Sequence, residues 1–170
     1  MRNRRSLPPF LPLALAWLGF AAYVWLTAGQ LPERVATHFG ANGEPNGWET
    51  QAGYVRFTLI FGAVVPAFVL GTFLFIRYLD GWGMNIPHKD YWLAPERQGQ
   101  TFAFIQRQGA WFAALLIAFF AGVHYTILAA NAHPHASLPP TFLPWIVGPF
   151  LVATIVWCAI FLRRFFRKPA

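Results

Sequence analysis

The stretch "FTLIFGAVVPAFVLGTFLFI", residues 57–76, decides the fold. It contains twenty consecutive residues without a charged side chain. An α-helix needs about 20 apolar residues to cross the hydrocarbon core of a bilayer, where it satisfies its own backbone hydrogen bonds. The stretch therefore predicts a transmembrane helix, for which we expect limits of about 55–79.

Three further segments have the same character, at about residues 9–29, 108–131 and 141–162, and none carries a charged residue in its middle. The whole chain is 56% hydrophobic and only 11% charged, whereas soluble domains carry about 25% charged residues. We therefore expect an all-α integral membrane protein, a single domain over residues 1–170 with four transmembrane helices. The start "MRNRRS" is similar to a secretory signal, but the apolar run that follows exceeds the roughly 7–15 residues of a cleaved signal. This length favours an uncleaved first span.

Charge predicts the orientation of the four spans. The chain has 13 Lys and Arg against 6 Asp and Glu, a net charge of +7. Eleven of the 13 basic residues lie before the first span, in the connection between the second and third spans or its flanks, or after the fourth span. Because Lys and Arg accumulate in cytoplasmic loops, we expect both termini and the connection 80–107 in the cytoplasm, and the connection 30–54 outside. The positive charge thus indicates orientation in the lipid bilayer of the bacterial cytoplasmic (inner) membrane, and no nucleic-acid partner is expected.

The outer connection contains "LPERVATHFGANGEPNGW", residues 31–48, which is rich in glycine and turn-forming residues. Two antiparallel helices can be joined by about 2–8 residues, and longer loops without regular structure are usually functional or disordered. Aromatic residues argue against disorder. We expect an ordered loop that folds onto the helices, with His38 and Glu44 as its polar centre. No nucleophile accompanies them, so binding is favoured over catalysis. The candidate binding or structural residues are His38, Phe39, Glu44, Pro45 and Trp48.

An alternative for the same face is a metal site. Four histidines are predicted on or near the outer side, beside Glu33, Glu44 and Glu49, and such side chains are ligands for zinc or copper. No HExxH helix or close cysteine–histidine spacing supports this interpretation, and hydrogen-bonded loop histidines are the other reading. A polar ring below the membrane surface, as at His124, needs a partner or a water-filled cavity. The candidate ligands are His38, Glu44, His124, His133 and His135.

The cytoplasmic connection contains "NIPHKDYWLAPER", residues 85–97. An acid–base interpretation pairs His88 with Asp90 or Glu96, but the loop and its flanks contain no Ser or Cys as nucleophile. The structural interpretation is an anchored elbow, in which Trp92 lies against the interface or the bundle end and Asp90 accepts hydrogen bonds. Pro95 is typical of a helix start and predicts an interfacial helix leading into the third span. The candidate residues here are Asn85, Asp90, Tyr91, Trp92, Glu96 and Arg97.

These two loops resemble a known family. The outer loop is similar to the signature of a bacterial membrane domain of unknown function, which also forms the N-terminal part of SdpI-type immunity membrane proteins. The second loop is similar to a stretch found in stand-alone members, although His88 stands where asparagine is expected. The resemblance covers roughly Phe10 to Arg107 and implies no catalytic role. The matching positions are Leu31, Pro32, His38, Phe39, Gly43, Glu44, Pro45, Asn85, Pro87, Asp90, Tyr91 and Trp92.

Taken together, the residues and the resemblance favour a non-enzymatic envelope protein of the binding, sensing or immunity type. Its outer loop would recognise something apolar or cationic, such as an extracellular peptide or an envelope protein, and no cofactor is expected. The alternative is a metal-dependent membrane enzyme that uses zinc or another transition metal held by the outer histidines. A small transporter subunit is a third possibility, but the spans lack the buried acids or bases that couple ions.

Overall fold

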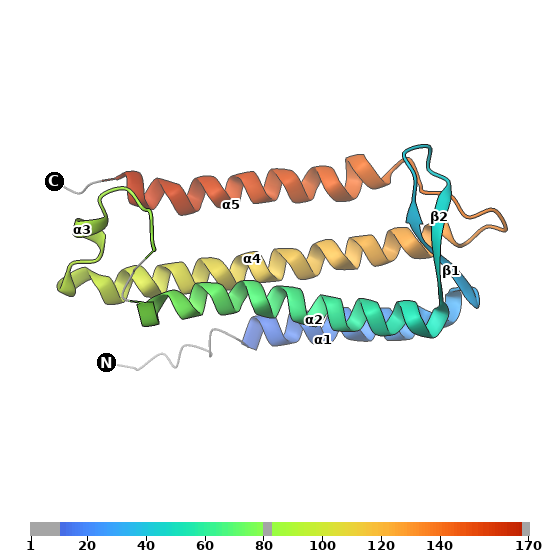
Figure 1. The fold of residues 1–170 in the computed structure, drawn as a ribbon, viewed down its shortest axis with the longest axis horizontal. Coiled ribbons are helices and arrows are strands. Elements are labelled where there is room, and N and C mark those ends of the chain that lie inside the picture. The colour runs from blue at the N-terminus through green and yellow to red at the C-terminus, as the bar shows by residue number, and fades with distance from the viewer. Residues whose placement is uncertain (1–10, 80–82, 168–170) are drawn as a thin grey trace, which may run out of the picture.

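The computed structural model describes residues 11–79 and 83–167. Four helices in this part of the chain are long and apolar enough to cross a membrane. They run alternately up and down, so the start of the first and the end of the fourth lie at the same end of the bundle (Figure 1). The long helices are α1 (Leu11–Thr27), α2 (Gln51–Phe75), α4 (Pro95–Ala130) and α5 (Gly148–Phe166). Short helical turns are η1 (Ala28–Gln30), η2 (Ile76–Leu79), α3 (Lys89–Trp92) and η3 (Leu143–Val147).

Helices α2 and α4 begin earlier than hydropathy alone predicts. Helix α2 starts at Gln51, where the Thr50 side chain caps it by accepting a 3.0 Å hydrogen bond from the Gly53 N–H. Helix α4 starts at Pro95 and continues without a break to Ala130. Its 36 residues correspond to about 54 Å, compared with about 30 Å for the hydrocarbon core. The segment expected as a separate interfacial helix is therefore the first part of one long helix.

The connection between α1 and α2 corrects the expectation of an all-α chain. Residues Arg34–Phe39 (β1) and Pro45–Thr50 (β2) form an antiparallel two-stranded sheet. The turn is closed by Gly40, whose N–H donates to the Glu44 carbonyl at 2.8 Å. Gly43 adopts a φ of +80°, a conformation that favours glycine. Turn residues flanked on both sides by strand-forming residues indicate a hairpin. The many glycines of this stretch favoured the prediction of a loop instead.

The bundle has two apolar cores, one at each end. The core beneath the hairpin joins α1, α2, α4 and the start of β1, and includes the fully buried Val24 and Val35. Here the Phe20 ring lies so close to Gly62 that a Cβ would overlap it. The core at the opposite end surrounds Phe165 of α5, which is also fully buried. Helix α4 is central, since it packs against α1, α2 and α5.

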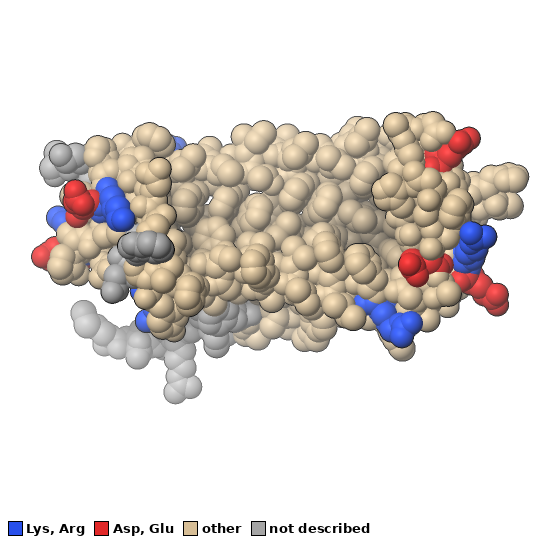
Figure 2. All heavy atoms as spheres, in the orientation of Figure 1, with Lys and Arg blue, Asp and Glu red and all other residues tan. Residues whose placement is uncertain are grey.

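Charged side chains lie at the two ends of the bundle, and the belt between them is uncharged on the face shown in Figure 2. At the hairpin end the described basic residues are Arg34 and Arg56. The other described basic residues lie toward the opposite end, in or beside the segments that are expected in the cytoplasm. They are Arg77, Lys89, Arg97, Arg107, Arg163, Arg164 and Arg167.

Candidate functional site

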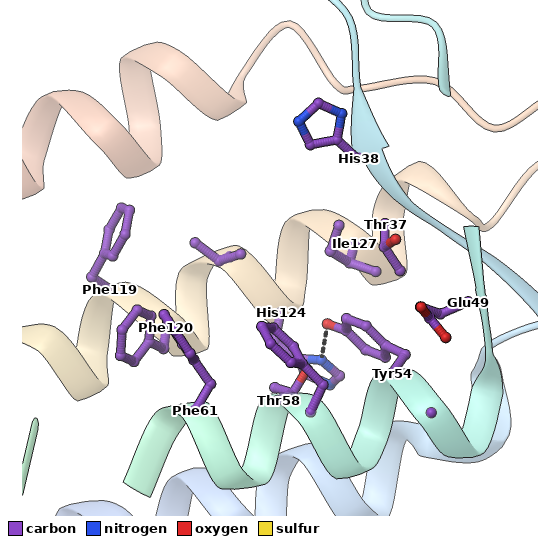
Figure 3. A pocket seen from close by; sticks show the side chains of 13 residues that line it. Thr37, His38, Glu49, Tyr54, Thr58, Phe61, Phe119, Phe120, His124 and Ile127 are labelled. Carbon is purple, nitrogen blue, oxygen red and sulfur yellow. Dashed lines mark hydrogen bonds between the residues drawn. The ribbon is translucent and has the colours of Figure 1, made fainter. Parts of the chain in front are cut away.

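A pocket of about 650 Å³ lies where the hairpin meets α2 and α4. We call it the hairpin pocket. Figure 3 shows Thr37 and His38 on the strand side, and Phe61, Phe119 and Phe120 at the opposite end. Polar groups therefore gather near the hairpin, and aromatic rings lie deeper along the bundle. The lining residues are Thr37, His38, Glu49, Gly53, Tyr54, Phe57, Thr58, Phe61, Phe119, Phe120, Val123, His124 and Ile127.

Helical spacing explains why these residues share one pocket. On α2 the lining residues Tyr54, Thr58 and Phe61 are separated by four and three positions, which places them on one face of a helix. On α4 the positions 119, 123 and 127 and the positions 120 and 124 repeat at intervals of four. At the far end the Phe119 ring stacks on Phe150 of α5, with centroids 4.3 Å apart. The walls of the pocket come from β1, β2, α2 and α4.

His124 lies at the centre of a buried hydrogen-bond chain beside this pocket. It is 1% exposed. Its Nδ1 is 2.8 Å from the Tyr54 hydroxyl, and its Nε2 is 2.8 Å from the Thr27 hydroxyl. The Thr27 hydroxyl donates its only proton to the Tyr23 carbonyl at 2.7 Å, so it accepts from His124. Nε2 therefore carries the histidine proton, and Nδ1 accepts from Tyr54.

This chain of hydrogen bonds links three helices through one neutral ring. Thr27 lies on α1, Tyr54 on α2 and His124 on α4. The Tyr23 ring also meets the His124 ring edge-on, with centroids 5.1 Å apart. The structure thus supplies the partners that a histidine inside a membrane span requires. Thr27 and Tyr54 were not among the sequence-based candidates, and their only signal was a polar side chain near the end of an apolar span.

The proposed metal ligands do not form one cluster. Within the described part of the chain, no group of three or more His, Cys, Asp or Glu side chains is placed to hold a metal ion. Both ring nitrogens of His124 are engaged in hydrogen bonds. His38 lines the hairpin pocket, whereas Glu44, His133 and His135 line a different pocket, between the other side of the hairpin and the α4–α5 connection. The five candidates are therefore divided between two pockets, with His38 and His124 in one and Glu44, His133 and His135 in the other.

His38 and Glu44 also do not form a common polar centre. The Nδ1 atom of His38 pairs with the Asn46 Oδ1 atom. The Glu44 carboxylate accepts a 2.6 Å hydrogen bond from the Asn42 side chain. Each candidate therefore has its own asparagine partner, across the strands for His38 and within the turn for Glu44.

The hairpin is fixed to the bundle through Asn131, at the end of α4. The Asn131 side chain accepts from the Ala36 N–H at 2.8 Å and donates to the Ala36 carbonyl at 3.0 Å. Gln51 makes a second attachment by donating to the carbonyls of Ala28 and Leu31, at 3.0 and 2.7 Å. The loop is therefore ordered and folded onto the helices. Both anchoring residues are polar residues at span ends, which is the signal that could have identified them.

The aromatic candidates of the hairpin differ in burial. Phe39 is partly buried and packs against the core beneath the hairpin. Trp48 remains 44% exposed, and the Arg34 guanidinium lies 4.9 Å from its ring centroid. Pro45 and Trp48 line the same pocket as Glu44. The hairpin thus borders two pockets, one lined by His38 and the other by Trp48.

At the opposite end, Trp92 closes the bundle. Its Nε1 donates to the Phe165 carbonyl at 3.3 Å, and its carbonyl accepts from the Thr101 hydroxyl at 2.9 Å. The Arg164 guanidinium lies over both the Trp92 and Phe104 rings, 5.3 and 4.4 Å from their centroids. These contacts join α3, α4 and α5.

The remaining candidate residues of this loop make fewer contacts with the rest of the protein. The Arg97 guanidinium lies 4.2 Å from the Tyr91 ring centroid. Asn85, Asp90 and Glu96 are exposed, and among the described residues no hydrogen bond reaches the Asp90 carboxylate, contrary to expectation. His88 has a φ of 55° and directly precedes α3. Helix α3 and strand β1, which contains His38, lie at opposite ends of the molecule (Figure 1). His88 and His38 therefore do not share a site.

The four candidate transmembrane helices define a multi-pass membrane protein. Within it, residues 13–63 match a family described as Domain of unknown function (DUF1648). An uncharacterized protein from Archaeoglobus fulgidus is 40% identical over 60 residues, which make up 35% of this chain and 30% of that relative. The chain thus spans less than a third of the relative's length. No solved structure matches the chain.

The matched interval includes most of α1, the hairpin and the first half of α2. It therefore contains the pocket residues of the hairpin and of α2, whereas the wall formed by α4 lies outside it. The family match lies in this part of the chain, and neither the family description nor that of the archaeal relative names an activity.

Proposed function

We propose that this protein is a non-enzymatic binding protein of the cytoplasmic membrane, of the sensing or immunity type, whose ligand occupies the hairpin pocket. The observation that carries the proposal is the pocket itself. It has a size within the range of roughly 300–1,000 Å³ typical of small-molecule sites and joins an aromatic interior to a polar rim. Such a site suits a ligand that is partly apolar and reaches the protein from the membrane or its surface.

Rigid attachment of the hairpin supports binding. Ala36, which pairs with Asn131, is directly followed by the pocket residues Thr37 and His38. Polar side chains on a fixed backbone need no ordering when a ligand arrives, and preorganisation of this kind lowers the entropic cost of binding. The resemblance to SdpI-type proteins adds a biological setting, in which the ligand is a secreted peptide or a product of the envelope.

The proposed orientation places the hairpin outside the cytoplasm and both termini inside. Its support is the positive-inside rule together with the position of the basic side chains. Seven described basic residues lie away from the hairpin end, in segments joined to α3, to the start of α4 or to the end of α5. In this orientation the pocket opens near the outer surface, where a secreted ligand first meets the membrane.

The metal-dependent enzyme is the weaker alternative. A zinc ligand needs an available nitrogen lone pair, and the hydrogen bond from Tyr54 engages the one on His124. His133 and His135 lie in a different pocket from His38. The binding function requires no rearrangement of these residues, whereas a catalytic metal site would require a large one.

The test is to identify what the protein retains from its own membrane. Wild-type protein would be extracted in native lipid particles, and the co-purifying small molecules identified by mass spectrometry. Val123→Phe narrows the pocket, because Val123 lines it. Val152→Phe is the matched control, since Val152 is 61% exposed on α5, away from the pocket. A ligand of the pocket is retained by the wild type and Val152→Phe and lost from Val123→Phe. Identical retention by all three proteins contradicts the proposal.

A further inference from the structure

The hydrogen-bond chain determines whether the Tyr54 hydroxyl can donate or accept a hydrogen bond in the hairpin pocket. Its proton is donated to His124 Nδ1, because the Thr27–Tyr23 bond assigns the histidine proton to Nε2. A phenol has one proton and remains able to accept. Tyr54 lines the pocket, so toward a ligand its oxygen acts as a hydrogen-bond acceptor.

The second polar group of the pocket, His38, has the same character. Its Nδ1 pairs with an amide oxygen, Asn46 Oδ1. An amide oxygen only accepts hydrogen bonds, so Nδ1 carries the proton. In the neutral ring Nε2 is then an acceptor. The hydrogen bond to Asn46 therefore holds the His38 ring in the tautomer with the proton on Nδ1, whose Nε2 can accept a hydrogen bond from a ligand.

The third group, Glu49, supplies charge. It is the only Asp, Glu, Lys or Arg among the residues lining the pocket. It is exposed, and its carboxylate forms no ion pair with a basic residue in the described part of the chain. The two neighbouring arginines are directed elsewhere, Arg34 over the Trp48 ring and Arg56 toward the Ala52 carbonyl. The pocket thus carries one uncompensated negative charge at its polar end.

Three other polar side chains line the pocket: His124, whose ring nitrogens are both engaged, and the hydroxyls of Thr37 and Thr58. Thr37 already donates to the Gly47 carbonyl at 3.5 Å. No lysine or arginine lines the pocket, so a phosphate or carboxylate would find no cationic partner there. The opposite end is formed by rings, including Phe61, Phe119 and Phe120. Ring faces bury apolar chains and also attract cations.

We infer that the ligand is a small cationic amphiphile that carries a primary ammonium group on a single apolar chain. The ammonium pairs with the Glu49 carboxylate, and the Tyr54 oxygen and His38 Nε2 are further acceptors in the same pocket for the three donors of an –NH₃⁺ group. The apolar chain lies among Phe61, Phe119 and Phe120. This inference rests on the proposed function, since it names the ligand class of the same pocket.

The experiment uses the full chain in nanodiscs of zwitterionic phosphatidylcholine and radiolabelled dodecylammonium as the probe. Saturable binding is measured after subtraction of the signal from empty nanodiscs. Unlabelled dodecanol and dodecanoate are the competitors, because they keep the chain and replace the cation with a neutral or an anionic head. We expect the unlabelled amine to displace the probe at about 10-fold or more lower concentration than either competitor.

Two variants assign the selectivity to the pocket. Glu49→Gln keeps the size of the side chain and removes its charge, and it should weaken amine binding about 10-fold, as expected for one charge-assisted hydrogen bond. Glu33→Gln is the matched control, because Glu33 is also an exposed carboxylate beside the hairpin but does not line the pocket. It should leave binding unchanged. Thermal unfolding of both variants checks that the fold is preserved.

Three results overturn the inference. The first is displacement by dodecanol or dodecanoate as effective as by the amine, and the second is an equal effect of the two glutamate variants. The third is the absence of saturable amine binding. Each of these results would exclude a cationic ligand. The proposed binding function would still stand if a ligand co-purifies with the wild type and is lost from Val123→Phe.

Discussion

The side chain of Asn131 pairs with the backbone of Ala36 as a neighbouring strand would, accepting from its N–H at 2.8 Å and donating to its carbonyl at 3.0 Å. The two residues are 95 positions apart. Ala36 is 1% exposed, so its backbone groups have no access to water. This pairing attaches β1 to the C-terminal end of α4.

Asn131→Leu should therefore loosen the hairpin while preserving the bundle. A buried N–H without a partner costs about 1–3 kcal/mol, and we expect a loss of this order in the free energy of unfolding. Amide hydrogen exchange at Ala36 and Val35 should accelerate, with little change in the middle of α4. His133→Ala is the control, because His133 is exposed in the adjoining connection. Unchanged exchange in Asn131→Leu would show that the hairpin is held by its apolar contacts instead.

The His124 hydrogen-bond chain should stabilise the packing of α1 and α2 on α4. His124→Phe keeps a ring of similar size but removes the partners of Tyr54 and Thr27. Hydrogen bonds between helices in membranes contribute about 0.6–2 kcal/mol each, so we expect a lower unfolding temperature in detergent. A double-mutant cycle with Thr27→Val measures the coupling. Additive effects of the two substitutions would argue against a connected chain.

The proposed topology predicts opposite labelling of two introduced cysteines. In a Cys158→Ser background, Asn42→Cys lies in the hairpin turn and Gln98→Cys near the start of α4. An impermeant thiol reagent applied to intact cells should label the first residue and spare the second. Permeabilised cells provide the control, because both sites should then react. Equal labelling in intact cells would refute the orientation.

The opposite end of the bundle should depend on Trp92 and tolerate change at Asp90. Trp92→Ala removes the hydrogen bond to Phe165 and the ring beneath Arg164, so the yield of folded protein should fall. Asp90→Asn should have little effect, since the carboxylate is exposed. The comparison is made by size-exclusion chromatography in detergent at equal expression. Normal folding of Trp92→Ala would show that α3 is dispensable for this end.

Much of the architecture was predictable because a transmembrane helix is a local property. The apolar run 57–76 must form a helix wherever it enters a bilayer, since no other partner is available for its backbone. The hairpin was missed because its strands are short and its turn contains several glycines. The helix start at Pro95 was predicted, but residues 95–107 were expected to form a separate interfacial helix because they lie outside the apolar run.

The candidate site was predictable only in part. His38 was identified as a binding residue and does line the hairpin pocket, but its expected companion Glu44 lines another one. Residue types alone indicated possible metal ligands. They did not indicate which of them would share a space, because that depends on the direction each side chain takes from its strand or helix.

The sequence by itself determined the number of spans and the polar connections between them, because hydrophobicity acts on each segment independently of the others. Tertiary structure decided what the polar residues do. Tyr54 meets His124 only because α2 and α4 pack together with a specific rotation about their axes, and Thr27 completes the chain only because α1 lies beside them. The hairpin pocket likewise exists only where β1, β2, α2 and α4 converge. Such relationships arise from packing between distant segments, and no local run of residues encodes them.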